Sequence, residues 1–264
     1  MNLDSYKNLS MRRDGKVLHV SFNRPESLNA FDPALHDEFE RFIFEVPRDD
    51  ATHVIVLSGV GKAFSAGGDI EQMQLMVDQP HLMYPEAGVA KRLINNFLDI
   101  PQPVIAKING AAMGLGSTLA LFSDISFAAN HAKIADPHVK VGYVAGDGGA
   151  VIWPALIGYA RAKQYLLTGD VITGEEAAKI GLVNFAHPAD ELDAAVDAFA
   201  QRLAGGARRA VQWTKATINV GLKQMAASVM DAGMAYETLS NHTRDHAEAV
   251  AAFRGKRPPQ FTGD

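Results

Sequence analysis

Two glycine-rich turns constrain the fold of this chain more than any other feature. One covers residues 63–70 (AFSAGGDI) and the other residues 109–117 (NGAAMGLGS). Each follows an apolar, strand-like run and leads into a helix-like run. Glycine allows backbone conformations that other residues avoid, so such turns can approach a ligand closely. Their free N–H groups can point at an anionic oxygen. The pair therefore predicts strand–turn–helix units and an enzyme that stabilises an enolate or a tetrahedral oxyanion.

The bulk composition is that of a globular protein. The 264 residues are enough for one large domain, or for one domain with an appendage. Hydrophobic residues make up 47% and charged residues 21%. The net charge of −5 argues against nucleic acid as a partner. The absence of cysteine excludes disulfides, thiolate metal sites and a cysteine nucleophile. We find no signal peptide and no apolar run of ~18 residues, which favours a cytoplasmic protein without a membrane partner.

Strand-like and helix-like patterns alternate through the first half of the chain. Asp32 is expected to cap a helix whose first residue is Pro33. Strands are expected over residues 16–23, 53–58, 104–108 and 124–129, and further helices over 70–77, 89–98 and 115–122, with a loop at 78–88. This alternation implies βαβ crossovers and a largely parallel sheet.

The pattern becomes helical after residue 145. Thr173 and Glu176 form a capping box for a helix that Gly181 ends. Three or four more helices are expected between residues 191 and 253, with a joint at residues 205–206. We expect the methionines of this region to pack between helices rather than bind a ligand; they are Met225, Met230 and Met234.

Six motifs in a fixed order resemble one known family. They lie at residues 22–30, 64–70, 108–116, 167–170, 181–184 and 252–257. On these motifs the chain resembles the enoyl-CoA hydratase/isomerase, or crotonase, superfamily over nearly its whole length. The resemblance implies an α/β fold, in which a core of stacked ββα superhelical turns (1–203) precedes a helical C-terminal region (204–264). That region drives trimers or dimers of trimers in the family.

The resemblance also implies a substrate and a set of binding residues. The substrate is an acyl-coenzyme A thioester of fatty acid metabolism, with no cofactor beyond the coenzyme A that it carries. The backbone N–H groups of Gly68 and Leu115 would hold the thioester carbonyl as an oxyanion hole. The other positions that match substrate or coenzyme A contacts are Ala66, Ile70, Gly114, Phe253 and Lys256. In the family the two tail positions often serve a neighbouring subunit.

The chain departs from the family at both catalytic glutamates. The first is replaced by Thr118 and the second by His138. Threonine is no general base near neutral pH, whereas histidine is one because its reference pKa lies close to operating pH. The usual two-carboxylate addition of water is therefore not supported by this sequence.

A histidine–aspartate pair remains as the candidate catalytic group. Asp147 follows His138 in a segment that resembles the β-diketone hydrolases of the superfamily, which cleave carbon–carbon bonds without coenzyme A. We expect Asp147 to bond one imidazole nitrogen, which fixes the tautomer and raises the basicity of the other. Such a pair can activate water or remove an α-proton.

Three functional hypotheses follow from these residues. The first is a lyase or isomerase that stabilises a thioester enolate and uses His138 and Asp147 in place of glutamates. The second is a hydrolase that cleaves a carbon–carbon bond or a thioester. The third is an acyl-coenzyme A binding protein without activity, because function lies in the site and not in the fold.

Several other residues have two interpretations. Tyr143 either lines the acyl pocket or packs in the core, and Glu237 either is structural or approaches the pocket. Asp69 is expected to cap the helix that starts at Ile70. No metal site is expected, because no His-x-x-x-His and no acidic cluster at ligand spacing is present.

Overall fold

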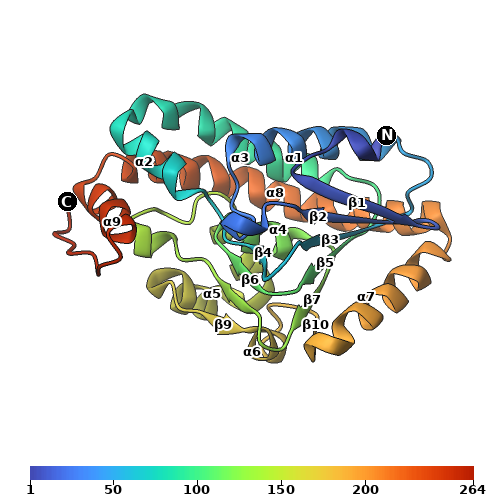
Figure 1. Cartoon of the computed structure of the whole chain (residues 1–264). Coiled ribbons are helices and arrows are strands. Elements are labelled where there is room, and N and C mark those ends of the chain that lie inside the picture. Colours follow the sequence, from blue (N-terminus) through green and yellow to red (C-terminus); the bar gives the residue numbers. More distant parts are fainter.

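Ten strands form two sheets that lie side by side (Figure 1). The computed structural model describes the backbone of residues 1–264 and every side chain except that of Ala87. The larger sheet has the order β1-β2-β3-β5-β7-β10, and the smaller has the order β4-β6-β8-β9. The strands of the larger sheet are β1 (Leu9–Asp14), β2 (Val17–Phe22), β3 (Val54–Gly59), β5 (Val104–Ile108), β7 (Ile125–Ala129) and β10 (Phe185–His187). Those of the smaller sheet are β4 (Ala63–Ser65), β6 (Ala111–Met113), β8 (Lys133–Ala135) and β9 (Ile172–Thr173).

A ββα unit repeats three times through this core. Each unit gives a long strand to the larger sheet, then a short strand to the smaller sheet, and then a helix. The units are β3-β4-α2, β5-β6-α4 and β7-β8-α5, with α2 at Ile70–Asp78, α4 at Leu115–Phe122 and α5 at Gly149–Thr168. Neighbouring units pair in parallel in both sheets. The expected fold of stacked ββα turns is thereby confirmed, and both glycine turns lie between a short strand and a helix.

Most expected elements are present, and the exceptions have physical causes. The helix expected at 89–98 begins earlier, as α3 (Met83–Leu98), so the loop expected at 78–88 was wrong in its second half. Pro85 lies in the first turn of this helix, where its missing N–H costs no hydrogen bond. Strand β1 is largely polar, and the strands of the smaller sheet have two or three residues, so neither gives a periodic pattern.

Local capping signals were predicted correctly. Asp32 Oδ1 accepts from Leu35 N at the start of α1 (Pro33–Glu45), and Asp69 Oδ1 accepts from Glu71 N at the start of α2. The capping box of Thr173 and Glu176 starts α6 (Gly174–Lys179). Three helices then complete the chain: α7 (Ala189–Ala204), α8 (Arg208–Ser240) and α9 (Arg244–Arg254). Met230 and Met234 are buried as expected, whereas Met225 is exposed.

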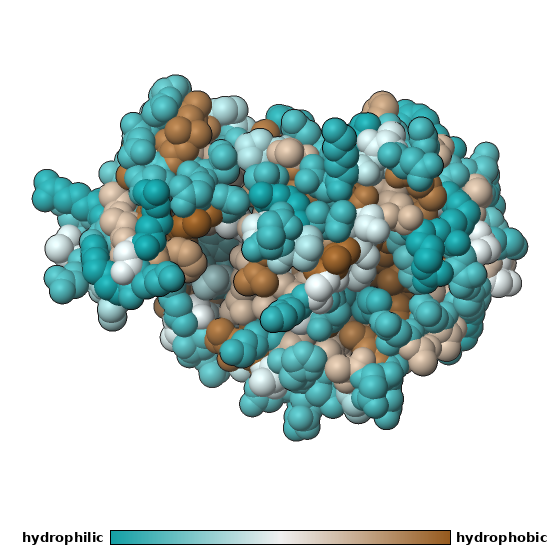
Figure 2. Space-filling view, viewed as in Figure 1, coloured by the Kyte–Doolittle hydropathy of each residue, from teal (hydrophilic) through white to brown (hydrophobic). Residues whose placement is uncertain are grey.

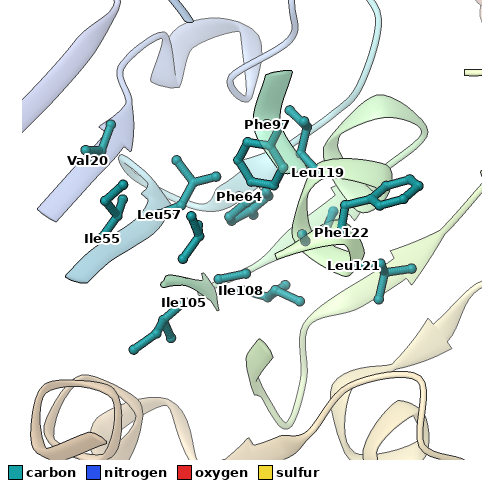
Figure 3. Packing of buried hydrophobic residues seen from close by; sticks show 14 of the residues in the cluster. Val20, Ile55, Leu57, Phe64, Phe97, Ile105, Ile108, Leu119, Leu121 and Phe122 are labelled. Atoms are coloured by element: carbon teal, nitrogen blue, oxygen red, sulfur yellow. The ribbon is translucent and has the colours of Figure 1, made fainter. Parts of the chain in front are cut away.

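The hydrophobic core lies between the larger sheet and the helices that cover it. Figure 3 shows apolar side chains from the sheet next to those of α3, β4 and α4; they include Ile55, Leu57, Phe64, Phe97, Ile105, Leu119 and Phe122. Burying such side chains supplies the main free energy of folding. This packing fixes the strand ends from which the glycine turns project. Among the described residues, no helix has both the length and the apolar character needed to cross a membrane.

Candidate active site

The first glycine turn presents an amide that has no acceptor in the described part of the chain. Phe31 N donates to Gly67 O, and Asp69 N donates to Phe31 O, on either side of Gly68. Gly67 has a φ of +90°, which glycine adopts without strain. The exposed Gly68 N–H is left unpaired between these two bonds.

The second glycine turn leaves a similar amide at the start of a helix. Gly114 has a φ of +49°, and its N–H donates to Ala135 O. Leu115 is the first residue of α4, so its N–H has no partner inside the helix. The helix dipole adds partial positive charge at this end.

The two turns touch one another. A Cβ added to Gly67 would lie 2.6 Å from Met113 O, and one added to Gly116 would lie 2.7 Å from Ser65 Cβ. Real Cβ atoms do not approach other atoms that closely, so these positions require glycine. Turns that are far apart in the sequence are therefore packed backbone against backbone.

His138 lies beside the second turn, between two aspartates. A Cβ on Gly114 would be 3.6 Å from His138 Cε1. Nδ1 of His138 is paired with Asp136 Oδ1, and Nε2 lies 3.6 Å from Asp147 Oδ2. The distance to Asp147 is longer than a hydrogen bond. A proton on Nε2 is therefore not committed to Asp147.

This arrangement corrects one part of the sequence-based hypothesis. Asp147 was expected to orient the imidazole, but the carboxylate that holds Nδ1 is Asp136, which the sequence analysis did not single out. Asp147 lies instead on the side of Nε2, the nitrogen that has no hydrogen bond. The available signal was the Asp-Pro-His order of residues 136–138, which places a carboxylate two residues before the imidazole.

The two carboxylates change the charge state of the imidazole. Burial by itself would lower the pKa of His138, but Asp136 and Asp147 outweigh it and raise that pKa well above its ordinary value. Burial raises the pKa of Asp147, and the neighbouring imidazole of His138 partly offsets this rise. The two carboxylates therefore favour the protonated imidazole, which has a proton to donate.

Thr118 supports Asp147 at the position of the missing glutamate. Its side chain is fully buried, and its Oγ1 donates to Asp147 Oδ1 over 3.3 Å. Close packing holds the aspartates in place, because a Cβ on Gly149 would lie 1.7 Å from Asp136 Oδ2. Oδ2 of Asp136 is buried without a partner among the described residues.

Glu237 approaches the same centre from α8. It is buried, and its Oε2 accepts from Gly146 N over 3.0 Å, next to Asp147 in the chain. Burial raises the pKa of Glu237 to about 8, and the charge of Asp147 adds to the shift while His138 opposes it. The side chain is therefore not solvated, and it lies beside the proposed catalytic residues.

Tyr143 is buried near this centre, and its hydroxyl is already engaged. The hydroxyl donates to Asn241 Oδ1 over 2.5 Å, and the ring stacks on His246. Burial raises the pKa of Tyr143, and Glu237 adds to the shift.

One group of described residues has the composition of a metal site. The ligand atoms of Asp136, His138 and Asp147 all lie within 4.8 Å of one another. Spacing in the sequence did not indicate this group. Because the carboxylates face different nitrogens of one ring, the arrangement fits proton transfer better than a shared ion.

The C-terminal tail lies against the helix that follows the first turn. Arg254 pairs with Glu71 at 3.3 Å and donates to Gln74 over 3.1 Å, both on α2. Phe253 and Lys256 flank Arg254 and are exposed. Ala66 and Ile70, which precede Glu71 in the chain, are half-buried. Figure 2 shows a hollow in this face, beside α2 and α9, with apolar atoms at its rim.

Comparisons with known proteins match one family over nearly the whole chain. The profile of the family described as Enoyl-CoA hydratase/isomerase matches residues 12–264. The chain is 31% identical to the 1,2-epoxyphenylacetyl-CoA isomerase of Escherichia coli, over 94% of this chain and 95% of that protein. It is 33% identical to the crotonyl-CoA hydratase of Syntrophomonas wolfei, over 97% and 98% respectively.

A solved structure extends the agreement to the fold. It is an enoyl-CoA hydratase/isomerase from Mycobacterium paratuberculosis, which superposes with a TM-score of 0.87 at 33% identity. The match covers 92% of this chain and 97% of that one. This chain therefore belongs to the enoyl-CoA hydratase/isomerase, or crotonase, family.

Proposed function

We propose that this protein catalyses proton transfer on an acyl-coenzyme A thioester, with His138 and Asp147 in place of the family's two glutamates. One observation carries the proposal: the His138 imidazole lies beside Gly114 with Asp136 on Nδ1 and Asp147 near Nε2. His138 as the acid and Asp147 as the base thus lie beside the second glycine turn, which is expected to hold the thioester.

The backbone would supply the electrostatic part of the reaction. The N–H groups of Gly68 and Leu115 lack protein acceptors in the described structure, and their turns are packed together. Two such donors on one thioester oxygen would stabilise the negative charge of an enolate. Ala66, Ile70, Phe253 and Lys256 are the residues we propose for coenzyme A, with the Lys256 cation near its phosphates.

The side chains would supply the proton transfer. Asp136 holds Nδ1, so the Nε2 proton of the imidazolium is available to a substrate carbon or oxygen. Asp147 has a raised pKa and accepts a proton more readily than an exposed aspartate does. The pKa of Glu237 is raised to about 8, which favours its neutral form and so limits the negative charge of the centre. These roles suit a hydratase or an isomerase, the activities named for the two curated relatives.

A substrate panel tests the proposal. The purified protein is offered crotonyl-CoA, longer 2-enoyl thioesters and 3-enoyl thioesters, and the enoyl absorbance and the products are followed. We expect turnover of at least one thioester, and a loss of kcat of about 10²- to 10⁴-fold in His138→Ala.

The matched control is His131→Ala, because His131 is an exposed histidine in the turn after β7. Turnover that survives His138→Ala would eliminate the proposed role. Saturable binding of thioesters without any turnover would identify a binding protein instead.

A hydrolase that breaks a carbon–carbon bond is the second candidate. It is favoured because His138 and Asp147 lie 3.6 Å apart and form a pair that could activate water. Neither glutamate of the family is present to add water to an enoyl chain. Water would add OH to a β-carbonyl carbon and deliver H to the carbon that leaves. Reaction of a β-keto thioester in ¹⁸O-water, followed by mass spectrometry, separates the candidates because only hydrolysis gives a labelled carboxylate.

We also propose that copies of the chain associate as a trimer or a dimer of trimers. Large apolar side chains of α8 are exposed in the single chain, with Trp213 at 67% and Ile218 at 69%. Exposed apolar surface of this kind is typical of protein interfaces. Sedimentation of the native chain and of Trp213→Glu tests this; a monomeric native chain would contradict it.

A further inference from the structure

The segment that joins His138 to Asp147 is held from outside by the C-terminal helices. Val144 N donates to Ser240 Oγ over 3.3 Å, near the end of α8. Gly146 is packed so closely that a Cβ there would lie 2.4 Å from Gly233 O. The position of both proposed catalytic residues therefore depends on helices that are remote in sequence.

His246, in the first turn of α9, makes two contacts with this segment. Its ring stacks on Tyr143, with centroids 3.8 Å apart and an interplanar angle of 14°. Its Nδ1 lies 2.6 Å from Val141 O. A carbonyl oxygen only accepts, so Nδ1 must carry a proton. Burial lowers the pKa of His246, which favours the neutral imidazole.

Asn241 ties the same segment to α2, the helix that follows the first glycine turn. Its Oδ1 accepts from the hydroxyl of Tyr143, and its Nδ2 donates to Met76 O over 3.1 Å. Met76 belongs to α2, the helix that begins just after the first turn. One side-chain amide thus joins the segment of Tyr143 to the last turn of α2.

A backbone hydrogen bond of Tyr143 connects these contacts to His138. Tyr143 N donates to His138 O over 2.8 Å. Gly142, with a φ of +71°, lets the segment approach α9, because a Cβ there would lie 2.8 Å from the backbone of His246.

We propose that His246 is a positioning residue for His138, which it acts on through Tyr143 and Val141. The catalytic part of this inference rests on the proposed function; the placement of the His138 ring does not. Loss of either contact would let residues 138–143 shift, and with them the imidazole of His138 relative to Asp136 and Asp147.

Two substitutions separate the two contacts. His246→Phe keeps a ring to stack on Tyr143 but has no donor for Val141 O. His246→Asn keeps a donor at the place of Nδ1 but loses the stacked ring. The control is His242→Asn, since His242 is an exposed histidine four residues earlier, between α8 and α9.

The first readout is the titration of the His138 imidazole by NMR with labelled histidine, assigned by the signal that is missing in His138→Gln. We expect each His246 variant to move this titration by at least about half a pH unit, because the carboxylate distances change. His242→Asn should leave it in place.

The second readout is steady-state turnover on the best thioester. We expect kcat to fall about 10- to 100-fold in the His246 variants with little change in KM, because the reacting groups are misplaced while the binding surface is kept. Thermal unfolding shows which variants remain folded.

The two proposals fail in different ways. If no thioester is turned over by the native chain, the proposed function fails while the NMR titration still tests His246. If both folded His246 variants keep the His138 titration of the native chain, the positioning role is overturned. Should one variant not fold, the other still decides the question.

Discussion

The two sides of the candidate site are built in different ways. The proposed oxyanion side consists of backbone. Two glycine turns, by their conformations and close packing, leave the amides of Gly68 and Leu115 without acceptors among the described residues. The proton-transfer side consists of side chains, His138 with Asp136 and Asp147, whose placement depends on contacts with α8 and α9. The backbone side follows from local sequence, whereas the side-chain side depends on tertiary structure. The experiments below challenge that division.

The largest effect is expected where the two turns touch. In Gly67→Ala the methyl group would lie 2.6 Å from Met113 O, so both turns must move apart. Misplacing an oxyanion donor costs about 10²- to 10³-fold in kcat. The control is Gly181→Ala, since Gly181 has a similar φ of +79° with nothing within 4 Å of its Cβ position. Equal losses in steady-state kinetics would show that backbone strain, not contact between the turns, is responsible.

The next effect concerns the carboxylate that orients the imidazole. Asp136→Asn removes the charge opposite Nδ1, so the pKa of His138 should fall toward its ordinary value. Loss of such an orienting partner typically lowers activity about 10- to 100-fold. The pH–rate profile checks this, with Asp170→Asn as the control because Asp170 is exposed. A profile that does not move would mean that Asp136 has no part in the charge state of His138.

A smaller effect is expected for the dependence of stability on pH. The ordinary pKa of a glutamate is 4.5, whereas that of Glu237 is about 8 in the folded chain. Between these values the folded state binds a proton that the unfolded state lacks, so stability falls as pH rises through this window. Glu237→Gln removes this contribution and should flatten the dependence. Urea unfolding at pH 5, 7 and 9 measures it, with the exposed Glu191→Gln as the control.

The smallest effect is expected at the position of the first missing glutamate. Thr118→Val keeps the volume but removes the 3.3 Å bond to Asp147. A hydrogen bond of this kind contributes about 1 kcal/mol, so we expect a similar loss in the free energy of unfolding and a few-fold change in kcat. A loss as large as that of Asp136→Asn would show that Thr118 acts in the reaction itself.

The parts of the fold that were predicted correctly carry local signals. Asp32 before Pro33, and Thr173 with Glu176, mark helix starts because the capping groups are neighbours in sequence. The start of α3 was missed because residues 78–88 contain two prolines and little apolar periodicity, although Pro85 joins the helix in its first turn. The two- and three-residue strands of the smaller sheet are too short for periodicity to reveal.

The same contrast between local and long-range signals applies to the residues of the site. The glycine turns were recognisable because the function proposed for them needs only backbone. His138 was found by its place in a family motif, and Asp136 was missed because only the turn at Pro137 brings the two side chains together. Glu237 reaches Gly146 across 91 residues of sequence, and no local pattern reports such a contact.

The 3.6 Å between His138 Nε2 and Asp147 Oδ2 bears on stereochemistry. Both groups belong to one short segment and so to one wall of the site. A planar enolate held by the two turns would meet them from a single side. A hydrogen removed by one group and a hydrogen returned by the other would then share one face of the substrate, which makes the transfer suprafacial. A product formed in deuterium oxide would carry its label in a single configuration.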